Sequence, residues 1–222
     1  MATTPSMSTP YVMKTVKNPQ PVALDDGVSS MQVQNQHECR LTGVFYRPTT
    51  TKLTIGEGAV VCSNAILKGE IIIGPGCILH PYCQILAMNG PISLGSSNII
   101  EEGATLVNDL PNPMAIGDRN LIEVGSRIEN STLEDDIIVE SRAFVAPGCH
   151  IASGCTVALA VGLIPATNLQ PNTIVWGPTA QQRQKEGERE LHRDMLAKHV
   201  DILRLSLVKY HRLLPVGTST LS

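Results

Sequence analysis

Two histidines offer the clearest potential chemistry in the middle of this 222-residue chain. His80 and His150 are the only histidines between residues 53 and 177. Imidazole is a common zinc ligand, and a catalytic zinc ion needs three protein ligands beside an open position. His80 precedes Pro81, which favours a surface or stacking role at a turn. We therefore expect no metal ion at these histidines.

Carboxylates are the other candidates for catalysis. Adjacent acids such as Glu101-Glu102 and Asp135-Asp136 could support acid–base chemistry, but their spacing predicts exposed positions where water solvates them. The sequence contains no Cys-x-x-Cys motif and no phosphate-binding glycine loop. These features predict no catalytic residue and no cofactor.

A six-residue repeat organises the sequence around these groups. Ile55-Gly56-Glu57-Gly58-Ala59-Val60 is typical, with a branched aliphatic residue first and a small residue fifth. A helix cannot accommodate this period, whereas a short strand and a tight turn can. The leading residues, called anchors below, are Ile55, Val61, Leu67, Ile73, Leu79, Ile85, Leu94, Ile100, Leu106, Ile116, Ile122, Ile128, Leu133, Val139, Val145, Ile151, Val157 and Leu163.

Three hexads close one triangular coil of a parallel β-helix, an all-β solenoid. The anchors fill the interior, and equivalent residues of successive coils lie about 18 positions apart, which places Ile55 beside Ile73 and Leu133 beside Ile151. Residues 55 to about 168 supply about six coils. Four cysteines take the small fifth position and are predicted to be buried packing residues in a reducing compartment: Cys77, Cys83, Cys149 and Cys155.

The repeat divides the chain into three parts. Residues 51–177 form the predicted solenoid. Residues 1–50 are rich in Thr, Ser, Pro, Gln and Asn without a sustained period, and we expect them to be largely disordered. Within them, Ser8-Thr9-Pro10 makes Thr9 a candidate phosphorylation site. Residues 178–222 change period and are predicted to form an amphipathic helix and a tail.

The predicted helix carries one apolar stripe. Its residues are spaced alternately by four and three, which draws a line along about five turns. We expect Gly187 in the first turns and Pro215 to stop the helix. Such a stripe must be buried, either along the solenoid of the same chain or against a partner, and the two are compatible. The stripe consists of Leu196, Val200, Leu203, Leu207, Tyr210 and Leu214.

Charge is distributed unevenly along the chain. Residues 53–177 contain four Lys/Arg against twelve Asp/Glu, giving −8, whereas residues 181–214 contain eight against five, giving +3. The basic helix therefore complements the acidic solenoid or a similar acidic neighbour. The net charge of −3 does not suggest nucleic-acid binding. We find no secretion signal and no apolar stretch long enough for a bilayer, so we expect a cytoplasmic protein without membrane insertion.

Particular hexads make the sequence similar to a known family. Asn98-Ile99-Ile100-Glu101 and Asn120-Leu121-Ile122-Glu123 repeat one pattern, and Glu140-Ser141-Arg142-Ala143-Phe144 follows at the matching spacing. Over roughly residues 53–214 the chain resembles the dynactin subunit 6 family of hexapeptide-repeat proteins. It departs from that family in its long N-terminal tail and in its short Val107–Ala115 loop.

The resemblance implies a left-handed β-helix with a non-catalytic scaffold role in the pointed-end complex of dynactin, the cofactor of cytoplasmic dynein. The implied partners are dynactin subunit 5, which is a sister β-helix, the pointed-end actin-related protein and the large zinc-binding pointed-end subunit. Dynein adaptors and cargo would be bound indirectly, in the cytoplasm and on the cytoskeleton. The alternative is a homotrimeric hexapeptide-repeat enzyme, either an acyltransferase or a gamma-class carbonic anhydrase.

Overall fold

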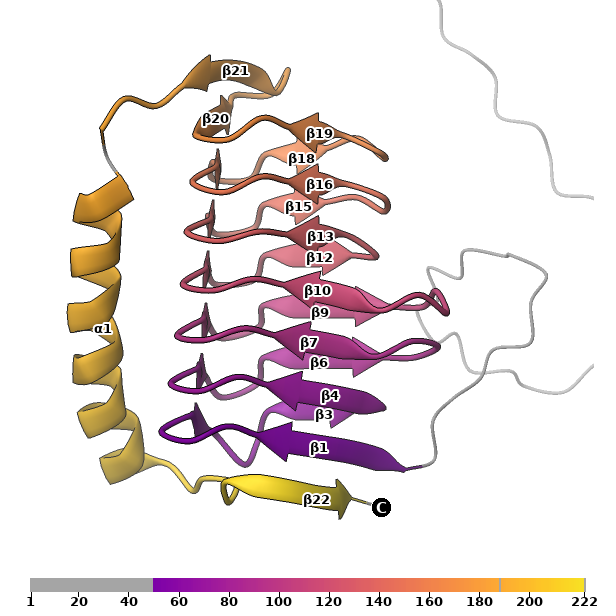
Figure 1. Ribbon diagram of the computed structural model, residues 1–222, viewed down its shortest axis with the longest axis vertical. Helices are drawn as coiled ribbons and strands as arrows, with labels where there is room; N and C mark the ends of the chain where they lie inside the picture. Colours follow the sequence, from indigo (N-terminus) through magenta and orange to yellow (C-terminus); the bar gives the residue numbers. More distant parts are fainter. Residues whose placement is uncertain (1–49, 188, 222) are drawn as a thin grey trace, which may run out of the picture. The chain divides into compact units, whose positions relative to one another are not determined.

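Short parallel strands stack into a solenoid in the computed structural model, which describes residues 50–187 and 189–221. Figure 1 shows the strands lying one above another, with a single helix running along one side of the stack. The parallel β-helix predicted from the hexads is confirmed. The expectations for residues 1–50, including disorder and the phosphorylation site at Thr9, fall on residues outside this description, Thr50 excepted.

Three sheets form the sides of the solenoid. The first sheet contains β1 (Thr51–Ile55), β4 (Glu70–Ile73), β7 (Ile92–Leu94), β10 (Met114–Ile116), β13 (Thr132–Leu133), β16 (His150–Ile151) and β19 (Asn168–Leu169). The second contains β2 (Val60–Val61), β5 (Ile78–Leu79), β8 (Ile99–Ile100), β11 (Leu121–Ile122), β14 (Ile138–Val139), β17 (Thr156–Val157) and β20 (Thr173–Trp176). The third contains β3 (Ile66–Lys68), β6 (Gln84–Ala87), β9 (Thr105–Asn108), β12 (Arg127–Glu129), β15 (Phe144–Val145) and β18 (Gly162–Leu163).

The register between coils follows the repeat. Ile55 pairs with Ile73 and Leu133 with Ile151, as the 18-residue spacing predicts. The solenoid has about seven coils, close to the predicted number of about six, because β19 and β20 continue the repeat beyond Leu163, the last predicted anchor. Each of these strands gains a full row of backbone hydrogen bonds from a neighbouring coil.

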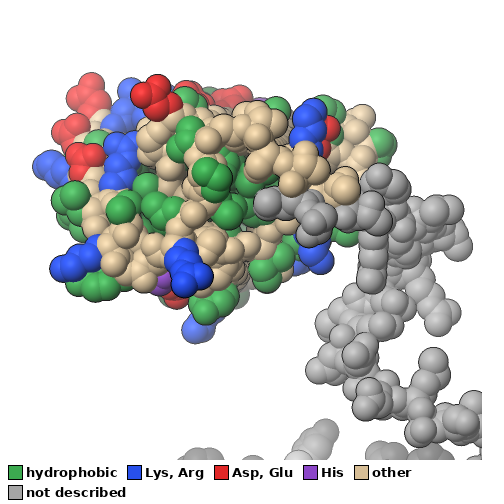
Figure 2. Space-filling model, turned by 90° about the horizontal axis from the view of Figure 1, so that it is seen from below, with side chains coloured by type: hydrophobic (Ala, Val, Ile, Leu, Met, Phe, Trp, Pro, Cys, Tyr) green, Lys and Arg blue, Asp and Glu red, His purple; other side chains and the backbone are tan. Residues whose placement is uncertain are grey.

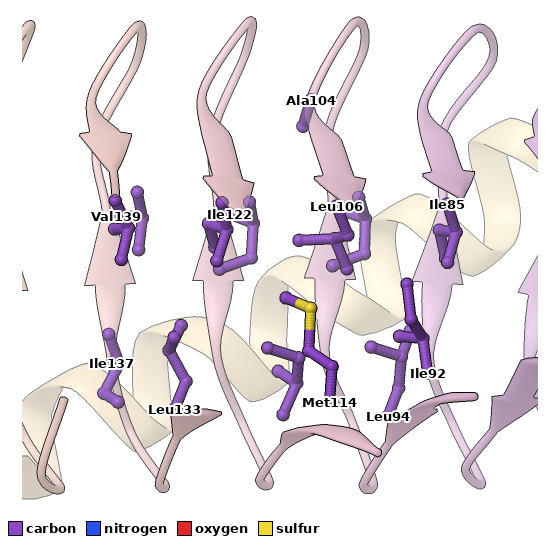
Figure 3. Packing of buried hydrophobic residues seen from close by; sticks show 14 of the residues in the cluster. Ile85, Ile92, Leu94, Ala104, Leu106, Met114, Ile122, Leu133, Ile137 and Val139 are labelled. Atoms are coloured by element: carbon purple, nitrogen blue, oxygen red, sulfur yellow. The ribbon is translucent and has the colours of Figure 1, made fainter. Parts of the chain in front are cut away.

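The anchors fill the interior of the solenoid. Branched aliphatic side chains point inward and stack along its axis, as Figure 3 shows for Ile85 and Leu106 of the third sheet and for Ile122 and Val139 of the second. These four side chains are fully buried. Burial of aliphatic surface in every coil stabilises the stack by nearest-neighbour contacts. The fold therefore provides a rigid body with three flat sides.

The C-terminal residues form three further elements. β21 (Gln181–Gln184) pairs antiparallel with β20, α1 (Arg189–Tyr210) follows, and β22 (Gly217–Leu221) pairs antiparallel with β1. The chain thus returns along the solenoid to its first coil (Figure 1). Gly187 precedes the helix, and the helix ends at Tyr210 rather than at Pro215. The two antiparallel strands are not predicted by the hexads, because they pair outside the repeat.

Candidate functional site

Helix α1 packs on the outer side of the second sheet. The sheet residue that precedes each anchor points outward, and in the first coils it is aliphatic. The helix covers this outward row, and the side chains of the row form one cluster with residues of α1. The row consists of Val60, Ile78, Ile99 and the partly buried Leu121. Aliphatic outward residues on one of three sheets are a signal in the sequence for where the helix docks.

The structure places most of the predicted stripe against this row. Leu196 and Val200 are each 4% exposed and Leu207 is 7% exposed. Leu203 is partly buried and packs on the same cluster. These four residues share one side of the helix because they recur every three or four positions. They join Val60, Ile78 and Ile99 in a small core separate from the interior of the solenoid.

The last two stripe residues depart from the prediction. Tyr210 is 71% exposed, so within this chain it does not take part in the contact between the stripe and the second sheet. The 3.5-residue average of the predicted spacing drifts around a 3.6-residue helix, and Tyr210 is the last helical residue. Leu214 lies beyond the helix, where it packs against the interior core and its N–H donates to the Val61 carbonyl at 2.9 Å.

A charged contact joins the N-terminal half of α1 to the solenoid. Arg193 Nε donates to Asp136 Oδ1 at 3.0 Å, and Arg193 Nη2 donates to Asp136 Oδ2 at 2.6 Å. Arg119, one coil away, donates from Nε to Asp136 Oδ1 at 2.7 Å, and Arg189 Nε lies 3.8 Å from Asp136 Oδ2. The Asp136 side chain is 1% exposed. The expectation of a solvated carboxylate is therefore wrong for Asp136, because the helix folds over it.

The arginines determine the protonation state of Asp136. Burial raises the pKa of this carboxyl, but hydrogen bonds from Arg193 and Arg119 and the charges of both residues outweigh burial and lower the pKa to about 2. The carboxylate is thus ionised at neutral pH and paired within hydrogen-bonding distance. Pairs of this type hold two elements in one relative position, since either partner left alone would carry an uncompensated charge.

A cavity of about 440 Å³ opens beside this contact. Its lining includes Asp136, Gly154 and Asn172 from three successive coils, together with Lys185 and Arg189 from the segment that enters the helix. A Cβ at Gly154 would lie 2.8 Å from Arg189 Nη2, so the glycine leaves room for the guanidinium. The cavity lies where the chain leaves the last coil and enters α1, which packs on the second sheet.

The repeated asparagines explain one of the characteristic motifs. Asn98 and Asn120 are fully buried at the turns between the first and second sheets. Asn98 Oδ1 accepts the Asn120 N–H at 2.9 Å, and Asn120 Oδ1 accepts the Ile137 N–H at 2.8 Å. Their amide groups donate to the carbonyls of Gly117 and Glu134. Each side chain thus satisfies backbone groups that the turn leaves unpaired.

The glutamates of the same motifs act at the turns that leave the second sheet. Glu101 Oε2 accepts the Val124 N–H at 3.1 Å, and Glu123 Oε2 accepts the Ser141 N–H at 3.0 Å. Glu140 Oε2 accepts the Leu159 N–H at 2.8 Å. Each carboxylate reaches the following coil. These acids therefore have a structural role in the described coils.

The two long interruptions of the hexad series, between Ile85 and Leu94 and between Leu106 and Ile116, form adjoining loops. Met88 N–H and Asn89 N–H both donate to the Asn108 carbonyl, at 2.8 and 3.2 Å. The Asn108 amide is buried and donates to the carbonyls of Pro91 and Asn112. At the tip of the second loop, Leu110 is 48% exposed. The loops project together from the corner between the third and first sheets, where a partner could reach them.

The two histidines of the solenoid lie in different surroundings. His80 is half-buried, and its pKa is lowered, mainly by burial. His150 starts β16, and its Nε2 lies 3.2 Å from Glu134 Oε1. Among the residues that the structure describes, no group of three or more His, Cys, Asp or Glu side chains could hold a metal ion.

The cysteines are packing residues, as predicted from the repeat. Cys77, Cys83, Cys149 and Cys155 are buried free thiols in the small positions of their coils. Burial raises the pKa of Cys77 to about 11 and that of Cys83 to about 12. Thiols with such pKa values are poor nucleophiles at neutral pH. Cys62 is a fifth buried thiol, which contacts the helix cluster.

Helix α1 could not cross a lipid bilayer. No helix of the described residues is both long enough and apolar enough to do so.

Comparisons with known proteins separate fold from family. A hexapeptide transferase family protein from Anaplasma phagocytophilum superimposes with a TM-score of 0.62 at 16% identity, covering 71% of this chain and 92% of that one. A putative acetyltransferase from Bacillus cereus gives a TM-score of 0.59 at 12% identity, covering 72% and 98%. Similarity at such identities shows the shared solenoid fold alone. No known protein-family profile matches the chain.

Curated relatives share more of the sequence. Dynactin subunit 6 from Nematostella vectensis is 33% identical over 178 residues, which cover 75% of this chain and 95% of that protein. Dynactin subunit 6 from Caenorhabditis elegans is 32% identical over 74% of this chain and 89% of its own length. The Xenopus tropicalis protein of the same name is 32% identical over 72% and 83%. On this similarity, which spans most of both chains, the protein belongs to the dynactin subunit 6 family.

Proposed function

We propose that this protein is a non-catalytic scaffold subunit of the dynactin pointed-end complex. The proposal follows from membership of the dynactin subunit 6 family, whose curated members carry the name of a dynactin subunit. In this role the protein supports dynein-driven transport along microtubules in the cytoplasm, and it contributes to adaptor and cargo binding through the complex. Its direct partners are dynactin subunit 5, the pointed-end actin-related protein and the large zinc-binding subunit.

The observation that carries this proposal is the use of the polar residues within the solenoid. Asn98, Glu123 and Asp136, which could otherwise serve chemistry, accept hydrogen bonds from the neighbouring coil or from the helix. The solenoid holds its backbone rigidly, so binding of a partner requires little ordering of the chain. A rigid body of this kind suits a structural subunit that contacts several neighbours.

A tagged pull-down tests the proposal. The full chain is expressed with a tag in cells of its own organism and recovered from native extract, and the bound proteins are identified by mass spectrometry. We expect actin-related proteins together with a second hexapeptide-repeat subunit. Recovery of the chain without any dynactin component would contradict the scaffold proposal.

The alternative function is acyltransferase-like chemistry, because the proteins of similar fold include a hexapeptide transferase family protein and a putative acetyltransferase. A homotrimeric enzyme would place its active site between neighbouring solenoids. Native mass spectrometry of the purified chain, with zinc analysis and an acyl-CoA binding assay, separates the two functions. A trimer that binds acyl-CoA saturably or holds stoichiometric zinc would favour the enzyme, whereas a 1:1 complex with another hexapeptide-repeat chain would favour the scaffold.

A further inference from the structure

The C-terminal residues of the chain close two of the three sheets at the N-terminal end of the solenoid. Strand β22 pairs with β1 along its whole length. On the second sheet, Cys62 pairs with Leu213, and the Ser63 N–H donates to the Arg212 carbonyl at 2.8 Å. Figure 2 looks onto this end, where apolar side chains are visible in the middle of the face and charged side chains toward its edges. The third sheet differs from the other two, because no described strand lies beyond β3.

Leu67 of β3 is the anchor that this open edge leaves exposed to water. The other anchors of the series are all buried, whereas Leu67 is only half-buried. Ala65, in the small position of the same strand, is also half-buried, and Ile66 between them is 41% exposed. At the opposite end of the third sheet, the last anchor, Leu163, is 3% exposed. A terminal position therefore does not by itself expose an anchor, and the described residues leave the interior of the solenoid uncovered at Leu67.

The chain enters the solenoid at this same edge. Thr51, the first residue of β1, donates from Oγ1 to the Leu67 carbonyl at 3.2 Å. The residues that lie outside the described part of the chain, 1–49, therefore join the solenoid beside the half-buried anchor. A segment tethered next to a surface acts at a high effective concentration, so that a small apolar contact is enough to hold it there.

The sequence places an apolar segment just before this point. Val44-Phe45-Tyr46 is followed by Arg47, and Phe45 is one of two phenylalanines in the chain. Phe45 precedes Thr51 by six positions, a length of chain that spans up to about 20 Å, so its ring can reach Leu67. The interior cluster contains no aromatic residue, because the coils are filled by aliphatic side chains. At an open end, by contrast, a ring can lie across the terminal anchor without overfilling a coil.

Pro48 prevents this segment from simply adding one more parallel strand. Equivalent residues of the third sheet lie 18 positions apart, as for Ile66 and Gln84, so a preceding coil would place Pro48 opposite Ile66. The Ile66 N–H donates to the Cys83 carbonyl, and the same position one coil earlier would have to donate to the Ala65 carbonyl. Proline has no N–H to donate. The residues before Pro48 are therefore suited to cover this end with side chains rather than with a regular strand.

We propose that Val44, Phe45 and Tyr46 close the N-terminal end of the third sheet, with the Phe45 ring over Leu67. The contact removes apolar surface of both residues from water. It completes the cover that β22 and Leu213 begin, so all three sheets end against residues of the same chain. It also shields a strand edge at which other chains could pair. A second copy or a separate protein would have to displace this tethered segment, and the inference does not depend on the proposed function.

Photo-cross-linking in the full chain tests the position of Phe45 and leaves every described residue unchanged. Phe45→benzoylphenylalanine carries the probe, and mass spectrometry after irradiation locates the linked residues. Tyr11→benzoylphenylalanine is the matched control, since Tyr11 is an aromatic residue in the same N-terminal stretch. We expect the probe at position 45 to link to residues 65–68 of its own chain at every protein concentration, and the probe at position 11 to show no preference for them.

The other cross-linking results would overturn the inference. Links between two copies that grow with protein concentration would identify a second copy as the occupant of the edge. Links from position 45 to other parts of the chain, or equal linking from both positions, would show that Phe45 does not cover Leu67. The absence of any link to residues 65–68 would show the same.

A double-mutant cycle provides an independent readout of the contact. Phe45→Ala should lower the melting temperature by about 2–4 °C in the unmodified chain, and by much less in a chain that carries Leu67→Ala, because the ring has then lost the surface that it covers. Tyr11→Ala, the control, should change the melting temperature of neither chain. Equal shifts from Phe45→Ala in both chains, or no shift in either, would contradict a direct contact between Phe45 and Leu67.

Discussion

Arg193 and Asp136 join the C-terminal helix to the solenoid through two parallel hydrogen bonds, 3.0 and 2.6 Å long. The carboxylate is almost completely buried, and Arg119 supports it from the neighbouring coil. Bidentate arginine–carboxylate pairs fix orientation as well as distance. This contact therefore sets the position of α1 on the second sheet, which the apolar stripe alone would leave free to slide.

We expect Asp136→Asn to lower the free energy of unfolding by about 2 kcal/mol, because it removes charge-assisted hydrogen bonds from a buried site. Asparagine tolerates the positive φ of 59° at this position, so the backbone need not change. Chemical denaturation measures the effect. Asp201→Asn is the control: Asp201 is 75% exposed and lies 3.8 Å from Arg204, so the change should be within about 0.5 kcal/mol. Equal effects of the two variants would contradict the role of Asp136.

The pH dependence of stability should report the same contact. The pKa of Asp136 is lowered from an ordinary value of 3.8 to about 2, so its contribution is present above pH 4 and is lost as pH falls toward 2. Thermal unfolding of the unmodified chain and of Asp136→Asn should therefore differ at pH 7 and converge near pH 2. A difference between the two proteins that is independent of pH would contradict this assignment.

Val200→Asp should detach the helix from the second sheet, because it places a charge in a cluster where Val200 is 4% exposed. We expect a loss of about 3 kcal/mol or more in the free energy of unfolding, or local release of α1 detected by limited proteolysis. Ile202→Asp is the matched control, since Ile202 is 63% exposed on the same helix. Val200→Asp with intact stability and a protected helix would show that the cluster does not hold α1.

The buried thiols should resist alkylation in the native protein. Burial raises the pKa of Cys77 to about 11 and that of Cys83 to about 12, so almost no thiolate exists at pH 8. Mass spectrometry after treatment with iodoacetamide should find both residues unmodified in the folded chain and alkylated in urea. Rapid modification of either residue without denaturant would show that the coil opens at that position.

Removal of β22 should create an open edge at the N-terminal coil. A chain that lacks residues 217–222 exposes the edge of β1, which can then pair with a strand edge of another copy. We expect oligomers whose size rises with protein concentration, measured by light scattering after gel filtration. A truncated chain that stays monomeric at every concentration would contradict the closing role of β22.

The hexads predicted the solenoid correctly because each anchor depends only on its own coil and the next. Periodicity alone identifies such a residue, so Ile122 and Val139 could be assigned to the interior without knowledge of the rest of the chain. The apolar stripe on the helix could likewise be predicted from spacing at Leu196, Val200, Leu203 and Leu207. At the end of the helix, Tyr210 belongs to the stripe by its spacing but does not contact the second sheet, because sequence spacing does not show which part of a helix remains in contact with its sheet.

The sequence by itself determined the repeating coil, its aliphatic interior and the presence of an amphipathic helix, since these follow from local spacing. Tertiary structure decided which sheet the helix covers, that Asp136 is buried by Arg193, and that β22 returns to close the first coil. These contacts join residues far apart in the chain. From the sequence alone, Asp136 is predicted to be a solvated surface acid. Its burial and charge pairing arise only when α1 folds over it, because both depend on the neighbours that the fold brings together.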